Sequence, residues 1–294
     1  MSALIFGVNS QDGQYLKKII ENKGVRTLGV SRSEGNWIRG DIGNRDFVSD
    51  IIKSEKPDVV FHLAANSSTK HSALFENHDT ISTGTLNLFE SVKNHSPNTK
   101  VFITGSGVQF KNKGSAISEN DDFEASSPYS IARIQSVYAA RYYRTLGIRS
   151  YVGYLFHHES PLRKGHHVSK LIAEKVNKIA NGAEDKIALG DISIRKEWAY
   201  SHDIALGIYT LINQDDIFEA AIGTGKAYSI QDWLEVCFNL VGKDWKSFVE
   251  TNESNFKAEY KLLVSDPSTI NKLGWFPQTS FEELAKIMLG ISKS

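Results

Sequence analysis

The sequence predicts an α/β protein with a doubly wound parallel sheet and a smaller C-terminal lobe. A strand, a glycine-containing turn, a helix and a second strand follow one another within residues 3–30. Two later apolar runs, residues 58–63 and 101–104, are nearly continuous, as in parallel strands that are buried on both faces. The alternation of strands and helices weakens after the strand at residues 150–156. We therefore expect residues 1–155 to form the sheet domain and residues 156–294 a lobe partly interleaved with the sheet.

The bulk composition excludes several classes of function. Lys plus Arg and Asp plus Glu balance at 34 each, which gives no reason to expect a nucleic-acid or anionic-membrane partner. The single cysteine, Cys237, excludes an intrachain disulfide and is typical of a reducing compartment. No apolar run has the length of a membrane span, and residues 1–7 lack the basic flank of a signal peptide. We expect a cytoplasmic protein.

The first turn has features of a dinucleotide site. It follows the predicted strand at residues 3–8 and carries Gly7 and Gly13, with Ser10 where a third glycine would complete the pattern. Small residues let a backbone approach a pyrophosphate, and the amides of the following helix face it. A tight strand-to-helix turn would need the same residues, but the strand–helix–strand context favours the cofactor site.

The end of the second strand indicates which nicotinamide cofactor is used. An acidic residue there would bind the ribose hydroxyls of NAD, whereas a basic residue would accept a 2′-phosphate. The sequence is Ser31-Arg32-Ser33, with no acid. We predict NADP(H), with NAD(H) as the alternative.

Further small and polar residues follow the next predicted strands. Asp41-Ile42 comes after a short third strand, ahead of a helix over residues 47–52. The strand at 58–63 runs into Ala64-Ala65-Asn66-Ser67-Ser68, and a helix is expected over 81–92. The strand at 101–104 is followed by Gly105-Ser106-Gly107 and a long polar loop. Ligands bind at the carboxyl ends of strands in open α/β sheets, so these residues are candidates for a site.

A helix is predicted to begin at Pro128, with Ser127 as its N-cap and Gly147 at its end. Tyr129 and Arg133 then lie on one face, and a cation beside a phenol favours the phenolate needed for proton transfer. A packed tyrosine with a solvated arginine is the alternative. The expected apolar face of this helix comprises Ile134, Val137, Tyr138, Tyr142 and Leu146.

The C-terminal half contains fewer strands. We predict helices over 168–180, 202–212, 230–241 and 281–289, and strands over 186–189 and 220–222. The sequence shows no repeats and no low-complexity linker.

Several motifs, taken in order, resemble the extended short-chain dehydrogenase/reductase family. These are the Gly7 and Gly13 turn, Ala64-Ala65, Ser106, and Tyr129 with Arg133 four residues later. Further stretches resemble the GDP-mannose 4,6-dehydratases within that family, and the likeness covers essentially the whole chain. They are Gln11-Asp12 before Gly13, Leu155-Phe156-His157-His158-Glu159-Ser160-Pro161, Leu189-Gly190, Glu197-Trp198, Asp266-Pro267 and Lys272-Leu273-Gly274-Trp275.

This resemblance implies a Rossmann-type NADP domain in residues 1–155 and a nucleotide-sugar-binding lobe in 156–294. Ser106 would bind the reacting sugar oxygen, Tyr129 would move its proton, and Arg133 would bind the nicotinamide ribose. The cofactor-binding residues it implies are Gly7, Ser10, Gln11, Asp12, Gly13, Arg32, Asp41, Ile42, Leu63, Ala64, Ala65, Ser67, Tyr129, Arg133, Leu155 and His158. The substrate-binding residues it implies are Ser67, Val108, His157, Glu159, Arg163, Lys170, Lys196, Lys257 and Glu259.

Three departures from the family pattern bear on the reaction. Arg133 replaces the usual lysine, and a planar guanidinium does not reproduce a compact ammonium. Val108 stands where the dehydratases carry the glutamate that removes the sugar C5 proton, and valine accepts no proton. The Arg-Pro pair expected before Glu259 is absent, with Phe256 and Lys257 nearby.

These departures favour an oxidoreductase or epimerase that acts on a GDP-hexose, with hydride transfer at C4. A lyase is the second hypothesis, with Glu119, Asp121 or Asp122 as a substitute base. The third is a non-catalytic paralogue that binds cofactor and sugar nucleotide.

Two clusters of residues invite further hypotheses. Neighbouring histidines at 157–158 and 166–167 do not provide the convergent ligands of a zinc site, so we predict no metal. The resemblance implies that the basic residues Arg163, Lys170 and Lys196 clamp two phosphates, with a solvated face as the alternative. In the family the Tyr129 helix commonly packs in a subunit interface, so the resemblance implies a homodimer or homotetramer.

Overall fold

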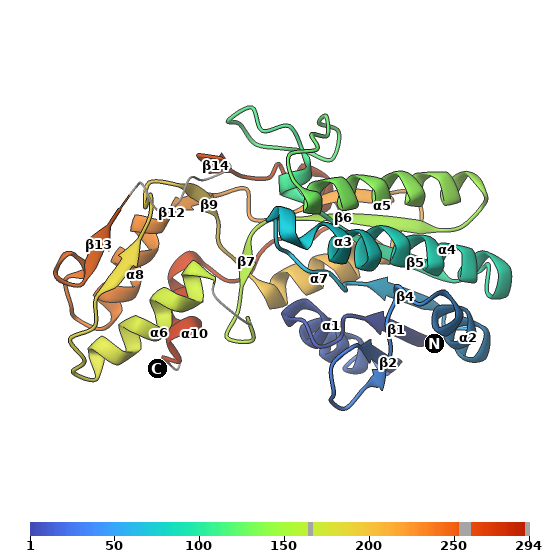
Figure 1. The fold of residues 1–294 in the computed structure, drawn as a ribbon, viewed down its shortest axis with the longest axis horizontal. Helices are drawn as coiled ribbons and strands as arrows, with labels where there is room; N and C mark the ends of the chain where they lie inside the picture. The colour runs from blue at the N-terminus through green and yellow to red at the C-terminus, as the bar shows by residue number, and fades with distance from the viewer. Residues whose placement is uncertain (164–166, 253–259, 292–294) are drawn as a thin grey trace.

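The computed structural model describes residues 1–163, 167–252 and 260–291 (Figure 1). Its centre is a parallel seven-stranded sheet in the order β11-β6-β5-β4-β1-β2-β3. The order reverses between β1 and β4, which opens a crevice at the carboxyl ends of the strands. The strands are β1 (Ser2–Phe6), β2 (Arg26–Ser31), β3 (Ile38–Arg39), β4 (Val59–His62), β5 (Lys100–Ser106), β6 (Ser150–Leu155) and β11 (Glu219–Ile222).

Helices cover both faces of the sheet, as the sequence predicts. On one face Val48, Leu88 and Val137 join the buried cluster formed with β1, β4, β5 and β6. On the other face Leu16 and Ile208 pack with the opposite side chains of the same strands. The helices are α1 (Gln11–Glu21), α2 (Arg45–Glu55), α4 (Gly84–His95), α5 (Pro128–Thr145) and α7 (Ser201–Ile212). The predicted doubly wound α/β architecture is confirmed.

The predicted helix over 81–92 is wrong at its start. The helical segment begins with α3 (Leu74–Asn77), continues through a π-helical turn (His78–Thr83) and then becomes α4. The π-helical turn consists largely of polar residues, although Ile81 is fully buried. It therefore lacks the apolar periodicity on which the prediction depends.

The helix α5 has the predicted ends but a different buried face. The Ser127 side chain caps it by accepting from Ser130 N at 3.2 Å, and Gly147 follows its last turn with φ +88°. Its core-facing residues include Ala132, Val137, Ala140 and Tyr143. The predicted apolar face is wrong for Tyr138, Tyr142 and Leu146, which are 58%, 60% and 44% exposed. Small alanines occupy the buried side of the helix, which packs against the sheet. The larger side chains of Tyr138, Tyr142 and Leu146 lie on the exposed side.

The C-terminal lobe packs three helices around Trp233 and Trp198 (Figure 1). The chain leaves the lobe to supply α7 and β11 to the sheet, and the division at residues 155 and 156 stays a prediction. Most strands of the lobe were not predicted because they have only two or three residues. The lobe helices are α6 (Val168–Ala180), α8 (Ile230–Leu240) and α10 (Phe281–Leu289), whereas α9 (Ser268–Lys272) packs against α7 and β11 of the sheet domain. The strands are β7 (His158–Glu159), β8 (Ile187–Leu189), β9 (Arg195–Glu197), β10 (Ala199–Tyr200), β12 (Ala227–Ser229), β13 (Val249–Thr251) and β14 (Leu262–Leu263).

Two further observations concern the single cysteine and whether any helix could span a membrane. Cys237 is a buried thiol in α8, and burial raises its pKa. No helix within the described residues is both long and apolar enough to cross a membrane.

Candidate active site

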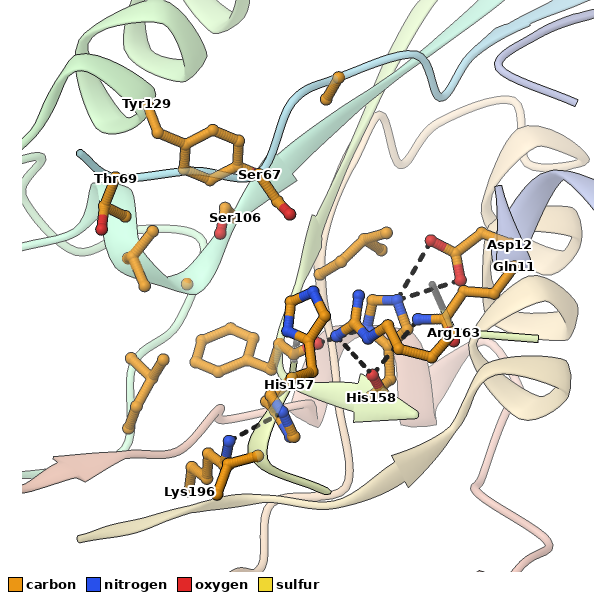
Figure 2. Close-up of a pocket in the computed structure, with 18 of the residues that line it drawn as sticks. Gln11, Asp12, Ser67, Thr69, Ser106, Tyr129, His157, His158, Arg163 and Lys196 are labelled. Atoms are coloured by element: carbon orange, nitrogen blue, oxygen red, sulfur yellow. Dashed lines mark hydrogen bonds and ion pairs between the residues drawn. The ribbon is translucent and has the colours of Figure 1, made fainter. Parts of the chain in front are cut away.

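A cavity of about 970 Å³ lies between the carboxyl edge of the sheet and the C-terminal lobe (Figure 2). In Figure 2, Tyr129, Ser67 and Ser106 lie in the upper part of the view, and His157 and Lys196 lie below them. The cavity brings together most of the site residues predicted from the sequence. Those that line it are Ser10, Gln11, Asp12, Leu63, Ala65, Ser67, Ser106, Val108, Tyr129, Arg133, Leu155, His157, His158, Arg163 and Lys196.

The turn after β1 is shaped by two glycines that do not themselves line the cavity. Gly7 has φ +82°, and a Cβ built on it would lie 2.5 Å from Ala64 N. A Cβ on Gly13 would lie 2.4 Å from Gly7 O. Ser10 caps α1 instead of approaching a ligand as a third glycine would, because its Oγ accepts from Gly13 N at 3.0 Å. The turn therefore keeps the close backbone packing of a dinucleotide site.

The N-terminus of α1 is tied to the segment around β7. Ser160 Oγ donates to Gln11 Oε1 at 2.8 Å, and His158 Nε2 lies 3.0 Å from Asp12 Oδ1. Burial of the His158 ring opposes its charged form, but the Asp12 carboxylate outweighs burial and raises the His158 pKa. These contacts explain why residues 11–12 and 157–161 form one region of the cavity wall.

Besides Gly7 and Gly13, four predicted cofactor residues do not line the cavity. Arg32 is half exposed and its Nη2 lies 2.9 Å from Glu76 Oε1. Asp41 Oδ1 accepts from Gly43 N at 2.9 Å, while Ile42 is buried in the core. Ala64 is in van der Waals range of the Gly7 turn. Their roles in cofactor binding stay predictions.

The predicted catalytic residues meet in one corner of the cavity. Tyr129 and Arg133 are 9% and 4% exposed, and Arg133 Cζ lies 5.0 Å from the centroid of the Tyr129 ring. Ser106 and Val108 line the same cavity after β5. Among the described lining residues only Asp12 and Asp191 carry carboxylates, and these bind His158 and Ser193. The corner thus offers a phenol, a hydroxyl and a cation.

The proposed substitute bases point elsewhere, so the expectation that one of them replaces the missing glutamate is wrong. Glu119 accepts hydrogen bonds from Ala221 N and the Thr269 hydroxyl. Asp121 accepts from the Ser118 amide and hydroxyl, at 2.9 and 3.0 Å. Asp122 is 82% exposed, and none of the three lines the cavity.

A buried polar cluster forms the wall contributed by the lobe. Lys196 Nζ lies 2.9 Å from His157 Nε2, which in turn lies 2.9 Å from Glu159 Oε1. His157 Nδ1 donates to the Glu197 carbonyl at 2.7 Å. Arg163 Nε lies 3.0 Å from Glu159 Oε2. Glu159 is fully buried behind this wall and does not line the cavity.

The charges of this cluster are set by burial and by one another. Burial opposes ionisation of Glu159, but the Arg163 guanidinium beside it outweighs burial and holds the Glu159 pKa well below its usual range. Burial lowers the Lys196 pKa to about 8, although Glu159 counteracts it. Burial and the nearby Lys196 charge lower the His157 pKa to about 3. At neutral pH, Arg163 and Lys196 therefore present positive charge to the cavity.

If Lys196 binds the diphosphate of a sugar nucleotide, as the resemblance implies, the affinity for that ligand should fall as pH rises through the Lys196 pKa of about 8. The protonated ammonium attracts a diphosphate, and this attraction is present below that pKa and is lost above it. Between about pH 7 and 9 we expect the Kd for GDP-mannose to rise by up to about tenfold. Isothermal titration calorimetry measures it. Lys196→Arg should flatten this dependence, and an unchanged slope in that variant would contradict the assignment.

Lys170, the third residue of the predicted phosphate clamp, does not line the cavity. Lys170 Nζ donates to the carbonyls of Arg163 and Pro161, at 2.5 and 3.3 Å, and so supports the preceding loop. Lys257 and Glu259 lie outside the described residues, as does His166. Within the described chain, no three His, Cys, Asp or Glu side chains are arranged to hold a metal ion.

Several lining residues were not predicted from the sequence. Thr69 and Lys70 extend the loop after β4, and the strand-edge rule that indicated Ser67 could have found them. The others come mainly from the start of α6 and from the short strands of the lobe, for which the sequence carries no signal. Unpredicted lining residues include Thr69, Lys70, Thr104, Leu162, His167, Leu171, Asp191, Ile194, Tyr260 and Leu263.

The GDP-mannose 4,6 dehydratase family model matches residues 4–288. GDP-mannose 4,6 dehydratase 2 of Arabidopsis thaliana is 28% identical over 98% of this chain and 85% of its own length. The human GDP-mannose 4,6 dehydratase is 26% identical over 98% and 90% of the two chains.

Solved structures share the fold at low identity. A UDP-glucose 4-epimerase of Thermotoga maritima, solved with UDP-glucose, superposes with TM-score 0.88 and 20% identity over 99% of this chain and 98% of its own. RMD of Pseudomonas aeruginosa, solved with NADPH, gives TM-score 0.85 and 18% identity over 99% and 98%. A parallel sheet with a smaller C-terminal lobe is therefore an established arrangement for this fold.

Proposed function

The chain belongs to the GDP-mannose 4,6-dehydratase family of NAD(P)-dependent nucleotide-sugar enzymes, and from this premise we propose a hydride-transfer reaction without elimination of water. The substrate is a GDP-hexose or its 4-keto form, and the reacting carbon is C4. The observation that carries the proposal is Val108, which lines the cavity two residues after Ser106, where the resemblance to the dehydratases implies a glutamate. The other groups in this corner, from Tyr129, Ser106 and Arg133, suit the oxidation or reduction of a sugar carbon that bears a hydroxyl.

The described residues suit a bound dinucleotide. The Gly7 and Gly13 turn permits close backbone approach, and the amides at the N-terminus of α1 face the same crevice. Bound NADP(H) would supply or accept the hydride. Tyr129 would give a proton to the sugar oxygen during reduction, or take it during oxidation, while Ser106 donates a hydrogen bond to that oxygen. Arg133 would bind the nicotinamide ribose.

We assign NADP(H) as the preferred cofactor because Arg32 stands at the end of β2 and no acid accompanies it there. Arg32 is half exposed and, among the described residues, is paired only with the exposed Glu76, so a 2′-phosphate can compete for it. NADPH should therefore bind more tightly than NADH, and Arg32→Ala should remove most of that difference. Fluorescence titration of both cofactors measures it.

Proton NMR tests the reaction. With GDP-mannose and NADP⁺ we expect no 6-deoxy methyl doublet, whereas GDP-4-keto-6-deoxymannose should oxidise NADPH and yield a reduced sugar. A methyl doublet from GDP-mannose would overturn the proposal in favour of the lyase. Tight binding of cofactor and both sugar nucleotides without any turnover would favour the non-catalytic paralogue, for which the replacement of lysine by Arg133 is the supporting observation.

We also propose that the protein forms a homodimer, or a homotetramer that contains the same dimer, through the exposed side of α5. Ile131, Tyr138 and Tyr142 are 39%, 58% and 60% exposed, and they recur at helical spacing on that side. Light scattering should give at least the mass of a dimer. The double variant Tyr138→Asp with Tyr142→Asp should shift it towards the monomer.

A further inference from the structure

Arg133 is held at one end by a residue that was not predicted to belong to the site. Its Nη1 donates to both the carbonyl and the hydroxyl of Thr104, at 2.6 and 2.5 Å. Thr104 lies near the carboxyl end of β5 and lines the cavity. The Thr104 hydroxyl therefore adds a second acceptor to the one that any residue's backbone would supply.

The remaining donors of Arg133 have no partner within the described chain. Nε is buried without a hydrogen bond, and Nη2 makes none with the described residues. No carboxylate of the described residues lies within ion-pair distance, although Arg133 is only 4% exposed. His62 lies near enough for the Arg133 charge to act on it. Burial and that charge lower the His62 pKa to about 3, so its ring is neutral and offers no compensating charge.

A buried cation with unpaired donors is costly, and a bound ligand that accepts from one of them removes part of that cost. Nε has no accessible surface, so Nη2 is the unpaired donor of Arg133 that a ligand in the cavity can reach. The N–H groups of a planar guanidinium point in fixed directions, so Arg133 needs one orientation to present Nη2 to the cavity. Thr104 provides that orientation by holding the opposite nitrogen.

We propose that Thr104 is a positioning residue that holds Arg133 with its Nη2 group towards the hydroxyls of the nicotinamide ribose. This inference rests on the proposed use of a nicotinamide cofactor but not on the reaction catalysed. The arginine and the threonine then act as one unit, and neither substitution alone should preserve nicotinamide binding.

Binding of NADPH and of 2′,5′-ADP tests the proposal. The second compound is the adenosine half of the cofactor and lacks the nicotinamide ribose. Thr104→Val removes the hydroxyl but keeps the β-branched shape, so we expect the Kd for NADPH to rise about tenfold with no change for 2′,5′-ADP. Thr104→Ser should restore wild-type affinity for NADPH. Equal weakening of both ligands, or no effect on NADPH, would overturn the proposal.

A double-mutant cycle separates positioning from a general effect on the strand. Thr104→Val should have little further effect in the Arg133→Lys background, because the lysine lacks the Nη1 group that Thr104 holds. Additive losses in the double variant would contradict the proposal. Because these experiments measure binding, they remain decisive if the hydride-transfer reaction is not observed. The protein would then bind NADPH without catalysing a reaction, and the role of Thr104 in binding could still be tested.

Discussion

Tyr129→Phe is expected to lower kcat by about 10²- to 10⁴-fold, the usual contribution of a positioned general acid or base. Tyr129 lines the cavity, and its ring packs against Arg133 and Ala132 at the start of α5. Removing only the hydroxyl keeps this packing, so the Kd values for NADPH and the sugar nucleotide should change little. Turnover is measured by NADPH oxidation with a 4-keto sugar nucleotide, and binding by calorimetry.

Tyr143→Phe is the matched control for this substitution. Tyr143 belongs to the same helix, but its hydroxyl donates to Glu90 at 2.7 Å and does not line the cavity. The control should therefore keep full turnover, whatever it costs in stability. If Tyr129→Phe also kept full turnover, Tyr129 would not be the proton donor. Loss of cofactor affinity with Tyr129→Phe would instead assign it a binding role.

The parts of the fold that follow from local chemistry could be predicted from the sequence. The strand at β5 is a continuous apolar run, and α5 has a serine cap, a proline in its first turn and a glycine after its last turn. The π-helical turn at His78–Thr83 could not be predicted, because its backbone geometry depends on tertiary packing around Ile81. The exposure of Tyr138 was missed for a related reason, since periodicity identifies an apolar stripe but not what covers it.

The site residues that follow the carboxyl ends of strands could be predicted from the sequence. Ser67, Ser106 and the turn after β1 follow directly from the topology of a parallel sheet. The contacts that decide the chemistry were not predictable, because they depend on side-chain orientation. Nothing in the sequence indicates that Arg133 donates to Thr104, or that Lys170 binds backbone carbonyls instead of facing the cavity.

Val108→Glu is expected to introduce elimination into an enzyme that otherwise lacks it. Val108 follows β5 two residues after Ser106, lines the cavity and packs beside Ile81, Tyr129 and Ala132. A carboxylate placed there would remove the C5 proton of a 4-keto intermediate and return a proton to the C6 hydroxyl, which would leave as water. The NADPH formed when C4 is oxidised would then supply a hydride to C6, and a proton added at C5 would complete the 6-deoxy methyl group. A positioned base contributes about 10²- to 10⁴-fold, so elimination should exceed that of the parent by at least about 10²-fold.

Val108→Gln is the control, because its side chain has nearly the same size and shape but accepts no proton from carbon. In deuterated water, proton NMR of GDP-mannose with NADP⁺ should show C5 exchange and a 6-deoxy methyl signal only for Val108→Glu. Exchange without a methyl signal would mean that the base acts but C6 lacks a proton donor. Absence of both, with GDP-mannose still bound, would contradict the view that one missing base separates this cavity from a dehydratase. The replacement of lysine by Arg133 would then have to account for the difference, and the combined variant Val108→Glu with Arg133→Lys would test it directly.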